Sequence, residues 1–537
     1  MGKTTVARTS SIVAGAVAIA MLSGCAWNPQ ELRAEVQLGL QPNQDVIALP
    51  EPEQVATAID RLPGVIEKTF DDTGVPGMAV AVVHEGKTVY SQGFGVRESG
   101  TDLEVTPETV FQIASLSKPL SATGIAAAIG ASDGALSWES PISQYMPNFA
   151  FSDPVVTQRA TVGDAFSHRT GLFTGAGDDL EDIGYDRAQI LERLTLQPLD
   201  TFRNSYHYSN FGVTIGAEAV AASRGQEWES LMDELVFEPI GMTSSTARYD
   251  DYLASDNRAV LHAKIDGEFV PRFERDADPQ APAGGVASSV ADLAEWMNVL
   301  LHEGESVDGE MVADADALRQ AMTPHVVSGA GPELTVRPSH YGFGFNASPM
   351  LSGRMAYSHS GAFVLGAGTA FQVVPELDLG IVVLTNGAPV GAAESVVAQF
   401  FDMVQFGEPT RDWTADFEGF FAGYLVPVGD LVGETPPSDS MLPSNIDQLL
   451  GEYQNSYFGD LILEREGDVL LARLGPDGVT QMQLTAWDGG VLAYAPSNEN
   501  APDGSLASAT FTRVGDDMSV TLESFDAQGL GTWTKKS

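Results

Sequence analysis

Basic side chains are scarce in this chain of 537 residues, and acidic side chains are abundant. Lysine and arginine together number 28 against 73 aspartates and glutamates, which gives a formal net charge of −45 at pH 7. Such a charge repels phosphate backbones and argues against nucleic acid as a partner. The acids are spread along the chain rather than gathered in a tail, so they predict a highly charged, solvated shell.

Cysteine occurs only at position 25, so no disulfide can form within the chain. Cys25 follows a basic start and an apolar run from Ile12 to Leu22. That run is too short to span a bilayer and predicts a signal peptide over residues 1–24. The stretch Leu22-Ser-Gly-Cys25 resembles the bacterial lipobox, in which the cysteine is lipidated and becomes the new N-terminus. An ordinary signal peptide that contains a cysteine is the alternative.

Long apolar runs are otherwise missing from the sequence. No second run of 18 apolar residues follows, so we expect a soluble body that is tethered to a membrane through Cys25. The alanine at position 26 replaces the aspartate typical of inner-membrane retention. This favours a location in the cell envelope, on the outer membrane and facing the periplasm.

Metal and cofactor signatures are absent as well. The eight histidines form no His-x-x-x-His pair. The acids at positions 178, 179, 181 and 182 lack the spacing and the glycine of a calcium-binding EF-hand loop. No glycine-rich phosphate loop is present. The sequence therefore implies neither a metal nor a cofactor.

Helix and strand patterns divide the rest of the chain into a tether, two folded regions and a linker. Residues 25–51 lack periodicity and predict a tether. Within residues 52–405 we expect a helix over 54–70, a hairpin with strands 78–84 and 88–94, helical patterns over 115–325, and a closing β-meander. Strands on both sides of a helical insert predict an α+β domain with an antiparallel sheet. Residues 406–445 are expected to be a linker and 446–537 a small all-β domain.

Ser115 and Lys118 form a Ser-x-x-Lys motif at the start of a helix predicted over residues 115–130. The spacing places both side chains on one helical face. A serine hydroxyl attacks a carbonyl only when a neighbouring base takes its proton. A lysine is such a base when burial or a nearby cation lowers its pKa. For this motif alone, a capping serine and a surface lysine are the alternative.

Two further motifs supply chemically matching groups. Tyr208-Ser-Asn210 offers a phenol that can shuttle a proton and an amide that can grip a substrate carbonyl. His359-Ser360-Gly361 lies on a predicted strand, and the N–H of Ala362 after it can pair with the N–H of Ser115 as an oxyanion hole. Taken singly, a core tyrosine with a turn asparagine and a strand histidine with a neighbouring partner are the alternatives.

Together, in this order and spacing, the three motifs resemble the active site of the β-lactamase/penicillin-binding-protein superfamily. The resemblance covers roughly residues 55–405. It extends to the stretches 75–82, 134–142, 167–172, 237–242, 282–290 and 379–386. It implies the fold of that superfamily, with an antiparallel sheet flanked by helices and a helical insert.

The resemblance also assigns roles. Ser115 would form an acyl-enzyme, Lys118 and Tyr208 would share the proton transfers with the base left open, and Asn210 would orient an acyl-side amide. His359 stands where the classical β-lactamases have a lysine, as in some D,D-peptidases, D-aminopeptidases and β-lactamase-like esterases. Because histidine is charged only at lower pH, carboxylate recognition is expected to be weaker than with a lysine, which argues against strong β-lactamase activity.

The function that follows is a serine hydrolase acting on a small-molecule or peptide substrate: an ester, a D-amino-acid peptide or a β-lactam-type compound. The alternative is a catalytically silent protein that binds or senses peptidoglycan fragments. The C-terminal domain resembles a small β-domain appended to such hydrolases. We expect a stabilising accessory, with covering the active-site mouth or binding a partner as alternatives. The oligomeric state is left open.

Overall fold

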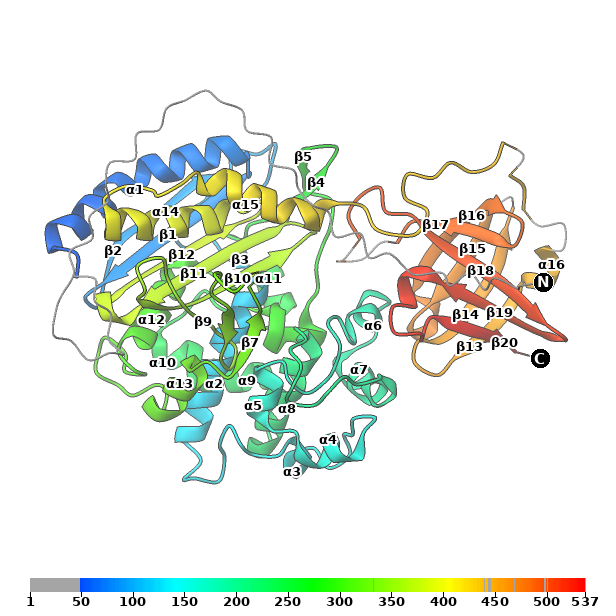
Figure 1. The fold of residues 1–537 in the computed structure, drawn as a ribbon, viewed down its shortest axis with the longest axis horizontal. Coiled ribbons are helices and arrows are strands. Elements are labelled where there is room, and N and C mark those ends of the chain that lie inside the picture. Colours follow the sequence, from blue (N-terminus) through cyan, green and yellow to red (C-terminus); the bar gives the residue numbers. More distant parts are fainter. Residues whose placement is uncertain are drawn as a thin grey trace, which may run out of the picture.

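The computed structural model describes residues 49–331, 333–438, 440–442, 446–467, 469–496, 499 and 501–536 (Figure 1). The predicted signal peptide, Cys25 and all but the last residues of the predicted tether lie outside these ranges. Among the helices that are described, none combines the length and apolarity needed to cross a membrane.

An eight-stranded antiparallel sheet forms the centre of the larger domain, in the order β2-β1-β12-β11-β10-β9-β8-β7. Its strands are β1 (Gly77–His84), β2 (Lys87–Gly95), β7 (Val326–Gly329), β8 (Ser339–Tyr341), β9 (Asn346–Pro349), β10 (Met355–Phe363), β11 (Ala367–Val374) and β12 (Leu379–Thr385). The predicted hairpin is confirmed, and β1 also pairs with β12, so that Val80 lies opposite Val383. The sheet thus joins both ends of the domain, as the α+β prediction requires.

Two helices cover one face of this sheet, α1 (Pro52–Thr73) and α14 (Ala392–Phe406) (Figure 1). Helix α1 confirms the predicted helix and ends at Gly74, whose φ of 67° suits a residue without a side chain. Leu62 and Ile66 are fully buried with Phe400 of α14 against the sheet. The burial of these apolar side chains therefore holds α1 and α14 against the sheet.

The opposite face carries α12 (Val290–Leu301) and the helical region. The other helices are α2 (Ser117–Gly130), α3 (Ile142–Tyr145), α4 (Pro154–Arg159), α5 (Val162–Phe166), α6 (Asp178–Asp182), α7 (Arg187–Arg193), α8 (Asn210–Arg224), α9 (Trp228–Met232), α10 (Glu238–Ile240), α11 (Tyr249–Ala254) and α13 (Ala315–Met322). Two short ladders join β3 (Phe111–Gln112) to β6 (Ala287–Ser288), and β4 (Ala263–Ile265) to β5 (Glu268–Val270). Helix α2 is buried from Ser117 to Ala128 and is the central helix of this region.

The segment expected to be a linker contains a folded helix, α15 (Trp413–Phe421). Asp412 caps it by accepting a hydrogen bond from the backbone N–H of Ala415. The Trp413 indole N–H donates to Asp402 of α14 at 2.6 Å, so α15 is held against the larger domain. Residues 413–421 are therefore part of a packed layer rather than a free connection.

The C-terminal region is a closed eight-stranded antiparallel barrel preceded by the short helix α16 (Ile446–Leu449). Its strands are β13 (Gly451–Asn455), β14 (Gly459–Glu466), β15 (Val469–Leu474), β16 (Thr480–Asp488), β17 (Val491–Tyr494), β18 (Ala507–Val514), β19 (Asp517–Leu522) and β20 (Thr532–Lys535). The Tyr185 hydroxyl, just after α6, donates to the carbonyl of Phe458 at 3.0 Å. Because both side chains are buried in one apolar cluster, the barrel is docked on the helical region.

Candidate active site

Ser115 lies in a tight 3₁₀ turn, Ala114–Leu116, that leads directly into α2. The preceding Ala114 is fully buried and has a φ of 48°, in the left-handed region that non-glycine residues seldom adopt. Ser117 braces this turn: its hydroxyl donates to the Ala114 carbonyl at 2.7 Å and accepts from the Val286 N–H at 3.0 Å. The strained backbone is thus held by its surroundings, which is common at functional positions.

Lys118 is completely buried one helical turn further on. Its Nζ lies 3.0 Å from Ser115 Oγ, 2.8 Å from Asn210 Oδ1 and 2.9 Å from the carbonyl oxygen of Ala283. Burial lowers the pKa of Lys118 to about 7, although the charge of Asp178 works in the opposite direction. The neutral amine is therefore accessible near neutral pH.

Tyr208 completes the contacts of the serine, since its hydroxyl donates to Ser115 Oγ at 2.8 Å. Its ring centroid lies 4.5 Å from Lys118 Nζ and also 4.5 Å from the His168 ring. His168 is fixed in turn, because its Nδ1 accepts the Ser209 N–H at 3.1 Å. Burial raises the pKa of Tyr208, so the phenol stays protonated.

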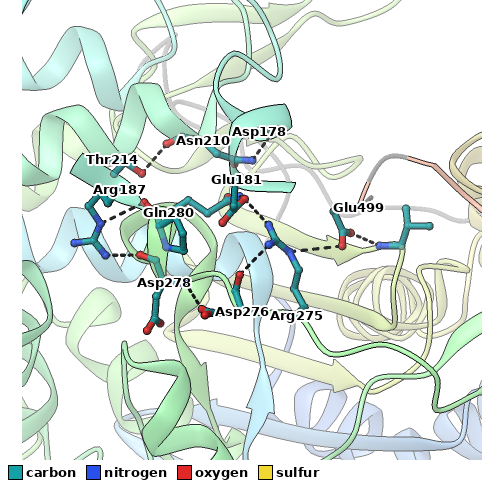
Figure 2. A network of polar contacts seen from close by, with 12 residues as sticks. Asp178, Glu181, Arg187, Asn210, Thr214, Arg275, Asp276, Asp278, Gln280 and Glu499 are labelled. Carbon is teal, nitrogen blue, oxygen red and sulfur yellow. Dashed lines mark hydrogen bonds and ion pairs between the residues drawn. The ribbon is translucent and has the colours of Figure 1, made fainter. Parts of the chain in front are cut away.

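Asn210, the first residue of α8, lies between the Lys118 amine and the carboxylate of Asp178, which Figure 2 shows beside it. Its Oδ1 accepts from Lys118, and its Nδ2 donates to Asp178 Oδ2 at 3.3 Å. A donor on one side and an acceptor on the other leave only one orientation of the amide that satisfies both. The structure thus brings Ser115, Lys118, Tyr208 and Asn210 into one hydrogen-bonded group.

His359 on β10 lies beside this group but is engaged elsewhere. Its Nε2 accepts from the Tyr341 hydroxyl at 2.8 Å, and its Nδ1 donates to the carbonyl of Ser360 at 2.6 Å. Burial, helped by the charge of Lys118, lowers the pKa of His359 to about 3. The imidazole is therefore neutral at physiological pH and offers no positive charge to a substrate carboxylate.

Gly361 allows β10 to pass close to the turn that holds Ser115. A Cβ at this position would lie 2.3 Å from Thr369 Oγ1 and 2.4 Å from the carbonyl oxygen of Ile113. This close approach places the next residue, Ala362, on the same cavity as Ser115. The arrangement suits the predicted oxyanion hole formed by their two N–H groups.

The site opens into a cavity of about 870 Å³. Ser115, Tyr208, Asn210, His359, Ser360 and Ala362 line one part of it. Another part is aromatic and comes from α15 and the turn after it, with Phe417, Phe420, Phe421 and Tyr424. Barrel residues Glu499, Ser524, Ala527 and Gln528 add a third part, so the C-terminal domain borders the active site.

Sequence reasoning missed several residues of this cavity. Glu394, near the start of α14, lines it and forms a hydrogen bond with Ser360, and burial raises the Glu394 pKa to about 7. Tyr341 holds His359, and Arg275 belongs to an acidic network on α6. None of these residues is part of a motif, so only the three-dimensional packing reveals them.

A second serine, Ser132, lies outside this chemistry. Ser132 belongs to a Gly-x-Ser-x-Gly stretch that resembles a hydrolase elbow, but it lies in the turn after α2, where its hydroxyl donates to the carbonyl of Ile129 at 2.7 Å. In the part of the chain that the structure describes, no three His, Cys, Asp or Glu side chains are grouped to hold a metal ion.

A serine contacted by a buried lysine and a tyrosine, on an α+β fold with a helical region beside the sheet, is the arrangement found in a class of serine hydrolases. Comparison with known proteins supports this class, because the model of the family described as Beta-lactamase matches residues 60–399. The chain belongs to this family, within the serine β-lactamase/penicillin-binding-protein superfamily.

The names of relatives in the family describe different activities. Penicillin-binding protein 4 of Amycolatopsis lactamdurans is 28% identical over 344 residues, which are 61% of this chain and 84% of that protein. The Unguisins hydrolase ungD' of Aspergillus campestris is 26% identical over 333 residues, and the match covers 60% of each protein. Esterase EstB of Burkholderia gladioli is 25% identical over 207 residues, 35% of this chain and 51% of that protein.

Solved structures share the fold. The octameric penicillin-binding protein homologue from Pyrococcus abyssi has a TM-score of 0.56 at 18% identity and covers 89% of this chain and 100% of its own. The hydrolase EstCE1, described with promiscuous acyltransferase activity, has a TM-score of 0.55 at 18% identity and covers 65% of this chain and 99% of its own. The predicted superfamily fold is therefore confirmed.

Proposed function

We propose that this protein hydrolyses esters or peptide-type amides through an acyl-enzyme on Ser115. The observation that carries the proposal is the pair of contacts at Ser115 Oγ, 3.0 Å to Lys118 Nζ and 2.8 Å to the Tyr208 hydroxyl. A capping serine and a surface lysine, the alternative for the motif alone, do not fit a lysine with 0% exposure.

The neighbours of Lys118 support its role as the base in acylation. Asn210 Oδ1 and the Ala283 carbonyl can only accept hydrogen bonds, so they take both N–H groups of the neutral amine. The remaining lone pair can then accept from the Ser115 O–H, whose oxygen lies 3.0 Å from Nζ. Tyr208 is held protonated and donates to the same oxygen, which suits a carrier of protons rather than the first base.

The reaction then proceeds in two stages, acylation of Ser115 and hydrolysis of the acyl-enzyme. Ser115 Oγ bonds to the substrate carbonyl carbon while its proton passes to Lys118, and the oxyanion is held by the N–H groups of Ser115 and Ala362. The bond to the leaving group breaks as Tyr208 gives that group a proton, and Lys118 restores the proton of Tyr208. Water cleaves the acyl-enzyme by the reverse route, which releases the acid and the free serine.

We place this activity in the cell envelope, with lipidated Cys25 as the anchor to the outer membrane. The support is the sequence alone: a short apolar segment followed at once by Leu22-Ser-Gly-Cys25. Metabolic labelling of the expressed protein with a fatty-acid analogue tests it, since Cys25→Ser should abolish incorporation. Incorporation into the Cys25→Ser variant would contradict the anchor.

Intact-protein mass spectrometry tests the hydrolase proposal. We expect full-length, detergent-solubilised protein to gain one adduct from a fluorophosphonate and to hydrolyse p-nitrophenyl butyrate. Ser115→Ala should lose both properties, whereas Ser132→Ala, the matched control, should keep them. A well-folded protein that no acylating reagent labels would instead be a silent binding or sensor protein of the same fold.

A further inference from the structure

One carboxyl group of the C-terminal barrel reaches the rim of the active site. Glu499 lies between β17 and β18, and its side chain is only 15% exposed where the barrel meets the turn that joins β10 to β11. Its Oε1 accepts a hydrogen bond from the backbone N–H of Val364 in that turn at 2.5 Å. The two residues are 135 positions apart in the chain, so this bond links the two domains directly.

The same carboxyl group faces a cation of the larger domain. Arg275 Nε lies 3.7 Å from Glu499 Oε2, and Arg275 Nη2 bonds to Glu181 of α6 at 2.6 Å on the other side (Figure 2). Arg275 is itself held, because its carbonyl accepts from the Gln112 side chain at 2.7 Å and its guanidinium lies 5.4 Å from the Phe363 ring centroid. Glu499 is therefore placed between a fixed cation and a backbone N–H, and both belong to the larger domain.

The turn after β10 adjoins two residues of the active-site cavity. Ala362, whose N–H belongs to the proposed oxyanion hole, and Phe363 are the last two residues of β10, and both line the cavity. Phe363 is 5% exposed and belongs to one apolar cluster with Ala114, the residue before Ser115. A displacement of Val364 would therefore reach the oxyanion hole and the turn that holds the nucleophile.

Pairing between the strands does not hold this turn. The ladder of β10 and β11 ends where Phe363 lies opposite Ala367, so the N–H groups of Val364 and Leu365 lie beyond it. Glu499 accepts from Val364, and the N–H of Leu365 also interacts with the Glu499 carboxyl. A backbone N–H that loses its acceptor away from water costs free energy. Without the carboxyl group, we expect the turn to move in search of other acceptors.

The restraint is a hydrogen bond and does not depend on charge. Burial raises the pKa of Glu499 to about 8, against the opposing influence of Arg275. A carboxyl group offers an accepting oxygen whether or not it is protonated, and so does the amide of a glutamine. The bond from Val364 can therefore persist in all three forms.

We propose that Glu499 is a positioning residue of the active site, which holds the turn after β10 and with it the Ala362 N–H beside Ser115. The inference rests on the proposed function. It gives the C-terminal domain a part in catalysis, beyond the stabilising role expected from its sequence. Glu499 acts on the reaction through Val364 rather than by contact with Ser115.

Steady-state kinetics of the full-length, detergent-solubilised protein with p-nitrophenyl butyrate test the inference, with active sites counted by fluorophosphonate labelling. We expect Glu499→Ala to lower kcat by about tenfold or more and to change KM by less than about threefold, because oxyanion contacts are strongest in the transition state. Glu499→Gln should restore kcat to within about threefold of the parent, since its amide oxygen can still accept the Val364 N–H.

A boronic acid gives a readout that a loss of stability alone would not change. Butylboronic acid forms a tetrahedral adduct with a nucleophilic serine, and one oxygen of the adduct takes the place of the oxyanion. A transition-state analogue of this kind reports the oxyanion hole directly. We expect its inhibition constant to rise in Glu499→Ala by about the factor lost in kcat/KM, and to return toward the parent value in Glu499→Gln.

Two control variants separate positioning of the turn from docking of the barrel. Asp503→Asn weakens an exposed contact of 3.9 Å to Arg272, at the same interface as Glu499. Tyr185→Phe removes the hydrogen bond to the carbonyl of Phe458 at another point of the interface. Neither change touches the turn after β10, so both variants should keep kcat within about twofold of the parent.

The outcomes separate the two proposals. Glu499→Ala with kcat and boronate affinity within about twofold of the parent would overturn the inference, and so would an equal loss in Tyr185→Phe. A Glu499→Gln variant as impaired as Glu499→Ala would overturn the role of the hydrogen bond. Where Glu499→Ala does not fold, as judged by circular dichroism, Glu499→Asp replaces it: it keeps the charge, shortens the reach and should also lose kcat. Absence of Ser115 labelling in the parent would instead refute the hydrolase proposal.

Discussion

Two polar clusters border the same cavity, and they differ in how their hydrogen bonds are completed. Around Ser115, the donors and acceptors of Lys118, Tyr208 and Asn210 match one another inside the protein. On α6, acidic oxygens of Asp178, Glu181 and Asp182 remain unmatched among the described residues. The first cluster is hydrogen-bonded throughout, as the proposed chemistry requires, whereas the second leaves several buried acceptors without a donor.

Burial shifts the pKa values of the two clusters in opposite directions. It lowers the pKa of Lys118 to about 7, and it raises the pKa of Asp178, one side chain away, to about 7. Both groups therefore spend part of their time uncharged near neutral pH. Groups whose pKa values are pushed away from their ordinary range cluster at functional sites.

The largest expected effect comes from removing Lys118, the proposed base of the first cluster. Lys118→Met should lower kcat/KM for p-nitrophenyl butyrate by about 10²–10⁴-fold, because the Ser115 proton then has no acceptor of suitable pKa. Lys87→Met, an exposed lysine on β2, is the matched control and should be neutral. Steady-state kinetics of both variants check this. Activity of Lys118→Met within a factor of ten of the parent would assign the base to another group.

Removing the cation of the second cluster should affect stability instead. Arg275→Met leaves Glu181 and Glu499 buried without a counter-charge, and such a loss costs about 3–5 kcal/mol of the free energy of unfolding. Arg272→Met in the same segment removes an exposed contact of 3.9 Å to Asp503 and should cost less than about 1 kcal/mol. Urea unfolding followed by circular dichroism compares the two. Equal midpoints would mean that the acidic cluster does not depend on Arg275.

A steric change at Gly361 tests how closely β10 must approach the first cluster. Gly361→Ala forces a Cβ against Thr369 and the carbonyl of Ile113, and should destabilise the protein by about 1–3 kcal/mol while displacing the Ser115 turn. Gly64→Ala in α1 is the control, since a Cβ there meets nothing within 4 Å. Thermal unfolding and fluorophosphonate labelling rates measure both effects. A Gly361→Ala variant as stable and reactive as Gly64→Ala would contradict the tight packing.

The first cluster was largely predictable from sequence, and the second was not. Helical spacing placed Lys118 beside Ser115, and the resemblance to a known superfamily added Tyr208, Asn210 and His359. From sequence alone, the acids of α6 belong to the expected solvated shell of charge and lack the spacing of a calcium-binding loop. Local sequence does not show that these side chains are buried. Only the packing of α6 between Arg275 and the barrel turns them inward.

The fold shows the same division. Alternating apolar residues predicted the hairpin of β1 and β2, and the helical period predicted α1. Helix α15 was missed inside the expected linker, because its stability depends on contacts with α14 such as the bond from Trp413 to Asp402. Likewise, the strands of the C-terminal domain were expected, but neither their closure into a barrel nor its place at the cavity follows from local pattern.

The smallest expected effect links the two clusters through pH. With p-nitrophenyl butyrate, whose charge is constant, kcat/KM should rise with pH and reach half its plateau near pH 7, because only the neutral Lys118 accepts the Ser115 proton. The Asp178 carboxylate stabilises the charged amine and so raises the pKa of Lys118. Asp178→Asn should therefore move the midpoint to lower pH, by less than about one unit across the partly solvated site.

The direction of that shift decides whether the clusters are coupled. Profiles from pH 5 to 9 for the parent, Asp178→Asn and the exposed control Glu192→Gln give three midpoints to compare. A lower midpoint in Asp178→Asn alone means that an acid of the second cluster tunes the pKa of the proposed base in the first. An unchanged or higher midpoint would mean that the charge of Asp178 does not tune Lys118.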